Sequence, residues 1–135
     1  MSPWIEAVLR FLLAVALGAG IGFQRERAGK AAGMRTLTLV SAGAALFTVV
    51  SIFGFGTVGV DISRVAAGVV VGVGFIGAGV ILRGEREEEV AGLTTAATIW
   101  VTAAIGLAAG AGMYLVALVV TAVIVGILLL PKIRG

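Results

Sequence analysis

Hydrophobic residues gather along the chain in five long runs, separated by short segments that carry most of the charge. Each run is close to the length of about 20 residues that a helix needs to cross the hydrocarbon core of a bilayer. The pattern predicts an all-α membrane protein, a bundle of about five transmembrane helices, forming a single domain over residues 1–135. The predicted spans cover residues 4–23, 36–55, 65–82, 93–110 and 113–130.

Composition supports a membrane protein over a soluble one. Hydrophobic residues make up 60% of the chain, charged residues only 13%, and the mean hydropathy is +1.17. Soluble domains are roughly half apolar and a quarter charged. The net charge of +3 would suit nucleic-acid binding in a soluble protein, but here the basic residues flank apolar runs. We therefore expect membrane lipid around the chain and no nucleic-acid partner.

The basic residues also predict an orientation, with the N-terminus outside and the C-terminus in the cytoplasm. The first positive cluster follows the first run instead of preceding it, which favours a retained helix over a signal peptide. Cytoplasmic segments are enriched in Lys and Arg, and this orientation places eight basic residues inside and two outside. The eight are Arg25, Arg27, Lys30, Arg35, Arg83, Arg86, Lys132 and Arg134, and the two are Arg10 and Arg64.

The third run is dense in glycine on two sides of its helix. Gly68, Gly72 and Gly79 fall within about 40° of one another on a helical wheel, whereas Gly74 and Gly77 fall on the far side. In lipid, helices associate through close packing of small residues and through hydrogen bonds. A helix with small residues on two sides can accept two neighbouring helices, so we expect the third helix to lie at the centre of the bundle.

The fourth run carries a stripe of hydroxyl groups. Thr95, Thr98, Thr102 and Gly106 lie within about 80° of one another, with Trp100 on the opposite side. We expect this stripe to be the polar surface that faces other helices, packed against the glycines of the third helix. A Trp far from the membrane interfaces is expected to pack against protein, and the Val- and Leu-rich fifth helix is expected to face lipid.

Near the start of the chain, Glu6 and Arg10 stand four residues apart and share one face of the first helix. Two interpretations stay open. The favoured one is a pair that neutralises itself at the outer membrane boundary, and the other is a buried functional pair.

Few residues offer catalytic or metal-binding chemistry. The chain has no Cys and no His, and no nucleophile stands beside a base, so no catalytic residue and no enzyme activity are expected. The segment Gly72 to Gly77 matches the dinucleotide fingerprint, but it follows no predicted strand, so no nucleotide is expected. The acidic residues 85–89 lack the spacing of a calcium loop and favour a solvated turn over a cation site.

Four ordered motifs together resemble the MgtC/SapB family of bacterial membrane proteins. The resemblance implies a five-span, multi-pass domain in the bacterial inner membrane. It also implies roles in growth under magnesium limitation and, in pathogens, in survival inside host cells. The motifs are Gly33-Met-Arg35-Thr36, Arg64-x-Ala-Ala67, Gly72-x-Gly-Phe-Ile-Gly-Ala-Gly-x-Ile81 and Gly92-Leu-Thr-Thr-Ala-Ala-Thr-x-Trp100.

The chain also departs from the pattern of that family. Gln24 stands where the family often has Glu, and Gly68 and Val71 stand where it often has polar residues. These differences weaken the expectation of a charged ion site. Members of the MgtC type tend to carry a C-terminal ACT-like domain after the last span. The given sequence stops at Gly135, so we expect the transmembrane domain only, either as a short family member or as the membrane part of a longer protein.

Two functions follow from these observations. The favoured one is a regulatory module that binds other membrane helices, either in a homodimer or with other membrane proteins, and the alternative is a transporter or channel for Mg²⁺ or another cation. No cofactor is expected beyond Mg²⁺, and no metal ligand is assigned. The candidate functional residues are Glu26, Gly33, Arg35, Thr36, Arg64, Gly74, Gly77, Gly79, Thr94, Thr95, Thr98 and Trp100.

Overall fold

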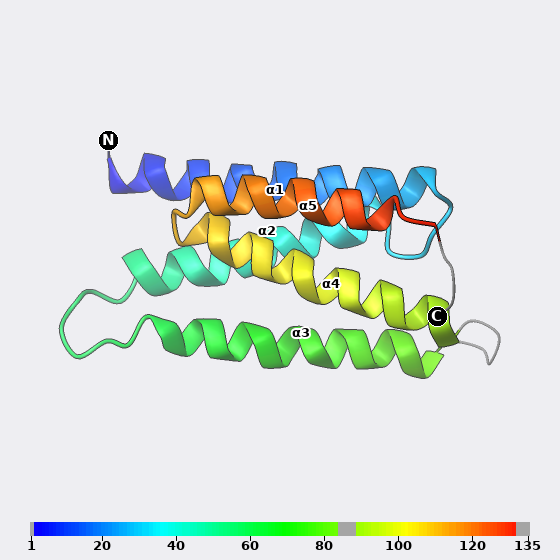
Figure 1. Ribbon diagram of the computed structural model, residues 1–135. Coiled ribbons are helices and arrows are strands. Elements are labelled where there is room, and N and C mark those ends of the chain that lie inside the picture. Colours follow the sequence, from blue (N-terminus) through cyan, green and yellow to red (C-terminus); the bar gives the residue numbers. More distant parts are fainter. Residues whose placement is uncertain (1, 84–88, 132–135) are drawn as a thin grey trace.

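The structure, a computed structural model, describes residues 2–83 and 89–131 and confirms the all-α prediction. The described residues form five helices and no strand, and Figure 1 shows how the helices are arranged. Four of the helices are long and apolar enough to cross a membrane, and the fifth is apolar but only 15 residues long. The helices are α1 (Pro3–Arg27), α2 (Met34–Phe53), α3 (Ser63–Arg83), α4 (Glu89–Gly110) and α5 (Tyr114–Leu128).

Local sequence signals account for where α1 and α3 begin. The hydroxyl of Ser2 accepts a hydrogen bond from the backbone N–H of Trp4, and Pro3 occupies the first turn of α1, where its missing N–H costs nothing. The carboxylate of Asp61 accepts bonds from the N–H and the hydroxyl of Ser63 at the start of α3. Those two bonds lower the pKa of Asp61 from its ordinary value, because they favour the charged form.

The helices alternate in direction along the chain, so α2 and α4 run parallel to each other and antiparallel to α1 (Figure 1). Helix α4 contacts all four other helices, and α1, α2 and α4 pack closely on one another. Helix α3 rests mainly on α4, and α5 lies against α1 and α4. The bundle is therefore a three-helix centre flanked by α3 on one side and α5 on the other.

The expectation that the third helix is central is wrong. Only 11% of the apolar window of α3 is buried, compared with 44% in α2 and 50% in α4. A Cβ atom added at Gly68, Gly72, Gly74 or Gly79 would meet no other atom within 4 Å. A helical wheel shows which sides of a helix are small, but it does not show which of them a neighbour uses. Helix α4 takes the central place.

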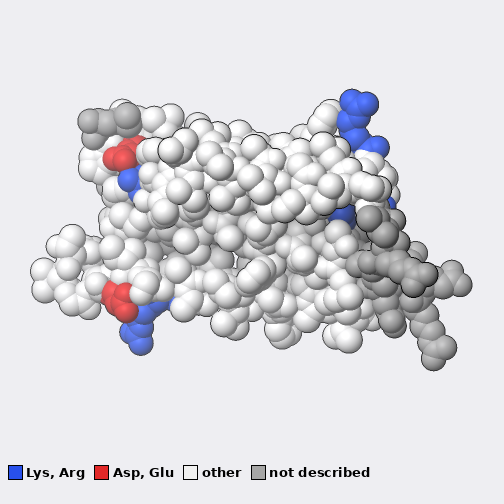
Figure 2. All heavy atoms as spheres, in the orientation of Figure 1, with Lys and Arg blue, Asp and Glu red and all other residues white. Residues whose placement is uncertain are grey.

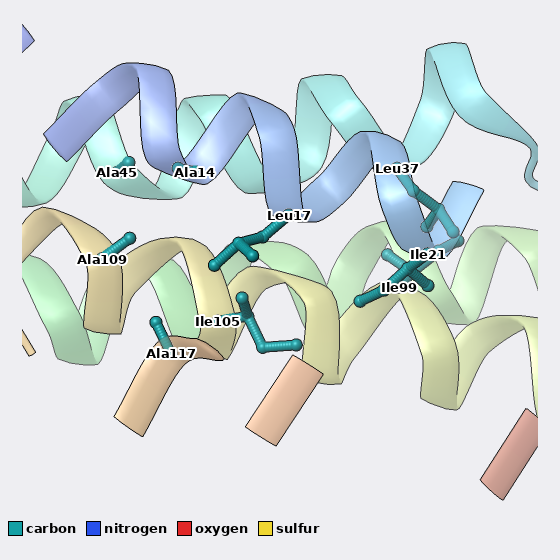
Figure 3. Packing of buried hydrophobic residues seen from close by; sticks show 9 residues of the cluster. All are labelled: Ala14, Leu17, Ile21, Leu37, Ala45, Ile99, Ile105, Ala109 and Ala117. Atoms are coloured by element: carbon teal, nitrogen blue, oxygen red, sulfur yellow. The ribbon is translucent and has the colours of Figure 1, made fainter. Parts of the chain in front are cut away.

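Small side chains let the central helices approach closely. Figure 3 shows the buried cluster, in which alanines line the contacts of α1, α2, α4 and α5, and a few larger residues fill the space between them. The fifth helix buries only Ala117 and Thr121 and exposes most of its other side chains, as expected of a lipid-facing helix. The cluster consists of Ala14, Leu17, Ile21, Leu37, Ala45, Ile99, Ile105, Ala109 and Ala117.

Charged side chains lie at the two ends of the bundle. In the face shown in Figure 2, Lys, Arg, Asp and Glu appear only near the ends, and the broad band between them carries no charge. Many large apolar side chains are exposed in the structure, for example Val71 and Phe75, which are 75% and 84% exposed. An exposed apolar band between charged ends is what a helical membrane protein presents to lipid. Of the acidic residues 85–89, residues 85–88 lie outside the described residues, and Glu89 is the first residue of α4.

Candidate functional site

The residues with buried polar chemistry lie where α1, α2 and α4 meet, in a contact region that we call the three-helix seam. Glycines bring the backbones together along it. A Cβ added at Gly18 would lie 2.7 Å from the carbonyl oxygen of Leu37, and one at Gly110 would lie 2.8 Å from that of Ala45. A Cβ at Gly106 would overlap the carbonyl oxygen of Ser41. The middle of the seam is therefore closed by direct contact between helices.

Hydroxyl groups in the seam bond mainly to helix carbonyls. Ser41 donates to the carbonyl oxygen of Ala14 at 2.7 Å and so links α2 to α1. Thr98 donates to the carbonyl oxygen of Thr94 in its own helix, at 2.7 Å. The hydroxyl of Thr102 is fully buried and has no protein partner.

The threonine stripe of α4 therefore faces α1 and α2, and the expected pairing of this stripe with glycines of the third helix is wrong. Thr95 bonds to α1, and Gly106 contacts α2. Helix α3 instead meets α4 where Gly77 lies against Ala96, with 3.5 Å between the Ala96 Cβ and a Cβ added at Gly77. The wheel identified the stripe correctly, but the stripe and the glycines of α3 do not face each other.

At one end of the seam, which we call the Arg25 end, a guanidinium group is buried. Arg25 is only 3% exposed, and no other charged side chain that the structure describes is buried. Its Nη2 donates to the hydroxyl oxygen of Thr95 at 2.6 Å and to the carbonyl oxygen of Ala31 at 2.7 Å. Its Nε donates to the same Ala31 oxygen at 3.2 Å. Arg25 thus ties the end of α1 and the following loop to α4.

Arg25 was expected in a cytoplasmic loop, and its buried position was not predicted. The helix was expected to end at residue 23, but it continues to Arg27. Arg25 lies 11 residues after Ala14, so the two are only about 20° apart on the wheel, on the side that also holds Gly18 and Ile21. Extending the small-residue edge of α1 by one turn would have predicted that Arg25 points inward.

A second cluster lies at the opposite end, which we call the Arg10 end. Arg10 pairs with Glu6 at 2.7 Å, donates to the carbonyl oxygen of Gly110 at 3.0 Å and donates to the hydroxyl of Tyr114 at 3.3 Å. Its guanidinium also lies over the ring of Phe53 at 5.1 Å. The predicted pair is confirmed, and it does more than neutralise charge, because Arg10 satisfies a free carbonyl at the C-terminus of α4.

Several candidate residues gather near the Arg25 end. The side chain of Glu26 lies against Gly33, where a Cβ would meet its Oε1 at 2.7 Å, at the start of α2. Arg35 and Thr36 follow in the first turn of α2 and are exposed. Thr94 is exposed as well, whereas Thr95 is buried against Arg25.

The remaining candidates lie elsewhere. Arg64 is exposed at the start of α3, at the end of the bundle opposite Arg25 (Figure 1). Gly74 and Gly79 contact nothing, and only Gly77 packs against α4. Trp100 is 56% exposed, so the expectation that it packs against protein is wrong within a single chain. The motif residues therefore form no single site.

The donor set gives little support for a bound metal ion. In the part of the chain that the structure describes, no group of three or more His, Cys, Asp or Glu residues could hold one. Mg²⁺ is normally held by carboxylates and keeps several waters. The seam offers hydroxyls, carbonyls and a guanidinium at each end, and these groups do not fit Mg²⁺.

The helices, the uncharged band and the charged ends define a polytopic α-helical membrane protein. The chain belongs to the MgtC family, whose profile matches residues 11–133. No solved structure matches the chain.

Among curated relatives, the chain is 52% identical over 115 residues to a protein of Escherichia coli K12 named putative magnesium transporter YhiD, covering 81% of this chain and 53% of YhiD. It is 45% identical over 130 residues to protein SrpB of Synechococcus elongatus, covering 89% and 71%. It is 44% identical over 125 residues to protein MgtC of Salmonella typhimurium LT2, covering 92% and 50%. The chain thus spans about half the length of YhiD and of MgtC.

Proposed function

We propose that this chain is a regulatory, helix-binding module of the bacterial inner membrane that acts under magnesium limitation. In this proposal the three-helix centre is a rigid scaffold, and α3 presents the surface that other membrane helices bind. The link to magnesium rests on the family and on the name of its relative YhiD. The helix-binding role rests on the arrangement of the bundle.

The observation that carries the proposal is a contrast between two parts of the bundle. The helices of the polar seam are in direct contact with one another, whereas most of α3 is exposed. Backbone contacts at Gly18, Gly106 and Gly110 seal the seam between α1, α2 and α4. Arg25 stands at one end and Arg10 near the other, about 22 Å apart along α1 at 1.5 Å per residue. A fixed guanidinium repels a divalent cation, especially where little water screens it. A cation path through this seam is therefore unfavourable.

Helix α3 has the opposite character. It has the highest hydropathy of the four long helices, 2.5, and the smallest buried share, 11%. Its exposed glycines allow another backbone to approach closely, which is how helices associate in lipid. Open glycines on an uncovered helix suit recognition of a further helix.

Cross-linking in intact membranes tests the proposal. We expect a Gly72→Leu variant to lose the cross-linked complexes of the wild-type chain, because the larger side chain keeps a second backbone away from α3. Gly126→Leu is the matched control, since Gly126 on α5 also has nothing within 4 Å. Equal complexes in both variants would show that α3 is not the binding surface.

A second function, Mg²⁺ transport, is favoured by the name of YhiD, at 52% identity. Vesicles that contain the purified chain and a Mg²⁺-sensitive dye would measure it directly. Magnesium entry above that of protein-free vesicles, driven by a gradient, would favour transport over the regulatory role. Because the seam is closed, we expect no such entry.

A further inference from the structure

Two arginines near the end of α1 point to opposite sides of the helix. Arg25 and Arg27 lie two residues apart, which is about 200° on the helical wheel. Arg25 is buried against α4 and the loop after α1, whereas Arg27 is exposed. Arg25 thus belongs to the packing of the seam, and Arg27 is directed away from the helices that pack on α1.

Arg27 stands at the end of the side of α1 that faces lipid. Four apolar residues lie within about 40° of it on the wheel, and all four are exposed. Because the bilayer surrounds this side, acyl chains lie along it. A phospholipid whose chains contact this side brings its headgroup to the level of Arg27. The four apolar residues are Leu9, Ala16, Gly20 and Phe23.

The ring of Phe23 holds the guanidinium at that level. The Cζ atom of Arg27 lies over the ring, 5.7 Å from its centroid, which is within the range of a cation–π contact. Phe23 is 49% exposed and ends the first apolar run, so its ring lies at the boundary between acyl chains and headgroups. The guanidinium is a planar group whose N–H donors match the oxygens of a phosphate.

The surroundings of Arg27 are positively charged. Figure 2 shows basic side chains at the end of the bundle where α1 ends. Lys30 and Arg35 are exposed there, and the one acid whose side chain is described at this end, Glu26, lies against Gly33. Exposed basic residues beside a membrane attract anionic lipids. The charge therefore favours an anionic headgroup over a zwitterionic one.

A lipid suits this position better than a further protein helix. A helix packed along this side of α1 would cover Arg27 and remove its charge from water, which is costly. A lipid phosphate leaves the guanidinium in the hydrated headgroup region and supplies the opposite charge.

We propose that Arg27 and Phe23 form a binding site for the headgroup of an anionic phospholipid, whose acyl chain lies along the exposed side of α1. The site goes beyond the proposed helix-binding function and is separate from its surface. Within the described residues, α1 and α3 are not in contact. Failure of one proposal therefore leaves the other standing.

Photocross-linking to a lipid probe tests the site. The probe is phosphatidylglycerol with a photoreactive acyl chain, diluted into phosphatidylcholine vesicles that contain the purified chain. We expect labelling of α1 near Phe23 that exceeds labelling by the matching phosphatidylcholine probe. Arg27→Gln should reduce the labelling about fivefold, which corresponds to about 1 kcal/mol for a basic residue at the membrane surface.

Other variants separate the site from general surface charge. Arg35→Gln is the matched control, since Arg35 is an exposed arginine at the same end that contacts no aromatic ring among the described residues. It should reduce the labelling less than about twofold. Phe23→Leu removes the ring and should reduce the labelling about two- to fivefold, whereas Phe23→Tyr keeps the ring and should retain it.

Three results would overturn the inference. Equal labelling by the two probes would show that the site does not select an anionic headgroup. An equal loss in Arg27→Gln and Arg35→Gln would show diffuse attraction by the charged surface in place of a site. Displacement of the probe by inorganic phosphate in solution would assign Arg27 to a soluble anion instead of a lipid.

Discussion

Arg25 shows how one residue can determine the packing at one end of the bundle. Removing a charge from water is costly, and a buried ion is tolerated only when hydrogen bonds satisfy it. The guanidinium meets the carbonyl oxygen of Ala31 and the hydroxyl of Thr95, which come from the loop after α1 and from α4. The orientation of these two segments is thus fixed by the geometry of a single planar group.

Replacing Thr95 by Val should therefore destabilise the protein. The change removes the acceptor 2.6 Å from Arg25 Nη2 without altering the size of the side chain much. Losing a buried hydrogen bond to a charged group costs about 1.5–3 kcal/mol, so the free energy of unfolding should fall by about that amount. Titration of the purified protein with a denaturing detergent measures it.

Two further variants serve as controls for Thr95→Val. Thr95→Ser keeps the hydroxyl and should retain most of the stability. Thr94→Val changes an exposed side chain one residue away and should alter the free energy of unfolding by no more than about 0.5 kcal/mol. A Thr95→Val protein as stable as Thr94→Val would mean that the Arg25 contact contributes nothing.

One half of this contact, Thr95, was predicted from the sequence, and the other half, Arg25, was not. Thr95 was selected because hydroxyls at helical spacing suit contacts between helices in lipid, and this contact is present. Arg25 was assigned to a loop because its charge dominated the interpretation. Its position on the inward side of α1 was available from periodicity, but the choice between a loop and a buried helix end required the position of α4.

At the scale of the helix, glycine allows a close contact between helices in α4 but not in most of α3. Gly106 and Gly110 of α4 lie against the backbone of α2, whereas Gly68, Gly72 and Gly79 of α3 face open space. The hydrophobic runs predicted the five helices to within a few residues, because chain length and the bilayer thickness constrain them strongly. Their neighbours could not be predicted, since small residues alone do not tell a filled contact from an empty one.

Alanine substitution should separate these two kinds of glycine. A methyl group at Gly106 overlaps the carbonyl oxygen of Ser41, so Gly106→Ala forces α2 and α4 apart. Overpacking of this kind costs about 1–3 kcal/mol. Gly126 meets no other atom within 4 Å, and Gly126→Ala should be neutral or stabilise by up to about 1 kcal/mol through helix propensity. Unfolding by detergent titration compares the two, and equal stability would contradict the closed seam.

At the scale of the whole molecule, the two ends differ in charge. Around the Arg25 end, the described side chains include four basic residues and one acid, whereas at the Arg10 end they are Glu6, Arg10, Asp61 and Arg64. Excess Lys and Arg keeps a loop in the cytoplasm, and acids count for little. We therefore infer that the Arg25 end is cytoplasmic. Its charged side chains are Arg25, Glu26, Arg27, Lys30 and Arg35.

This orientation predicts which loops a membrane-impermeant maleimide can reach. Val58, in the segment between α2 and α3, is 94% exposed, and Lys30 is exposed in the segment between α1 and α2. In spheroplasts, Val58→Cys should be labelled at once, whereas Lys30→Cys should be labelled only after lysis. The reverse pattern would mean that the protein has the opposite orientation in the membrane, because each helix crosses the bilayer once and the two loops lie on opposite sides. Labelling of both in intact spheroplasts would instead show that α2 does not span the membrane.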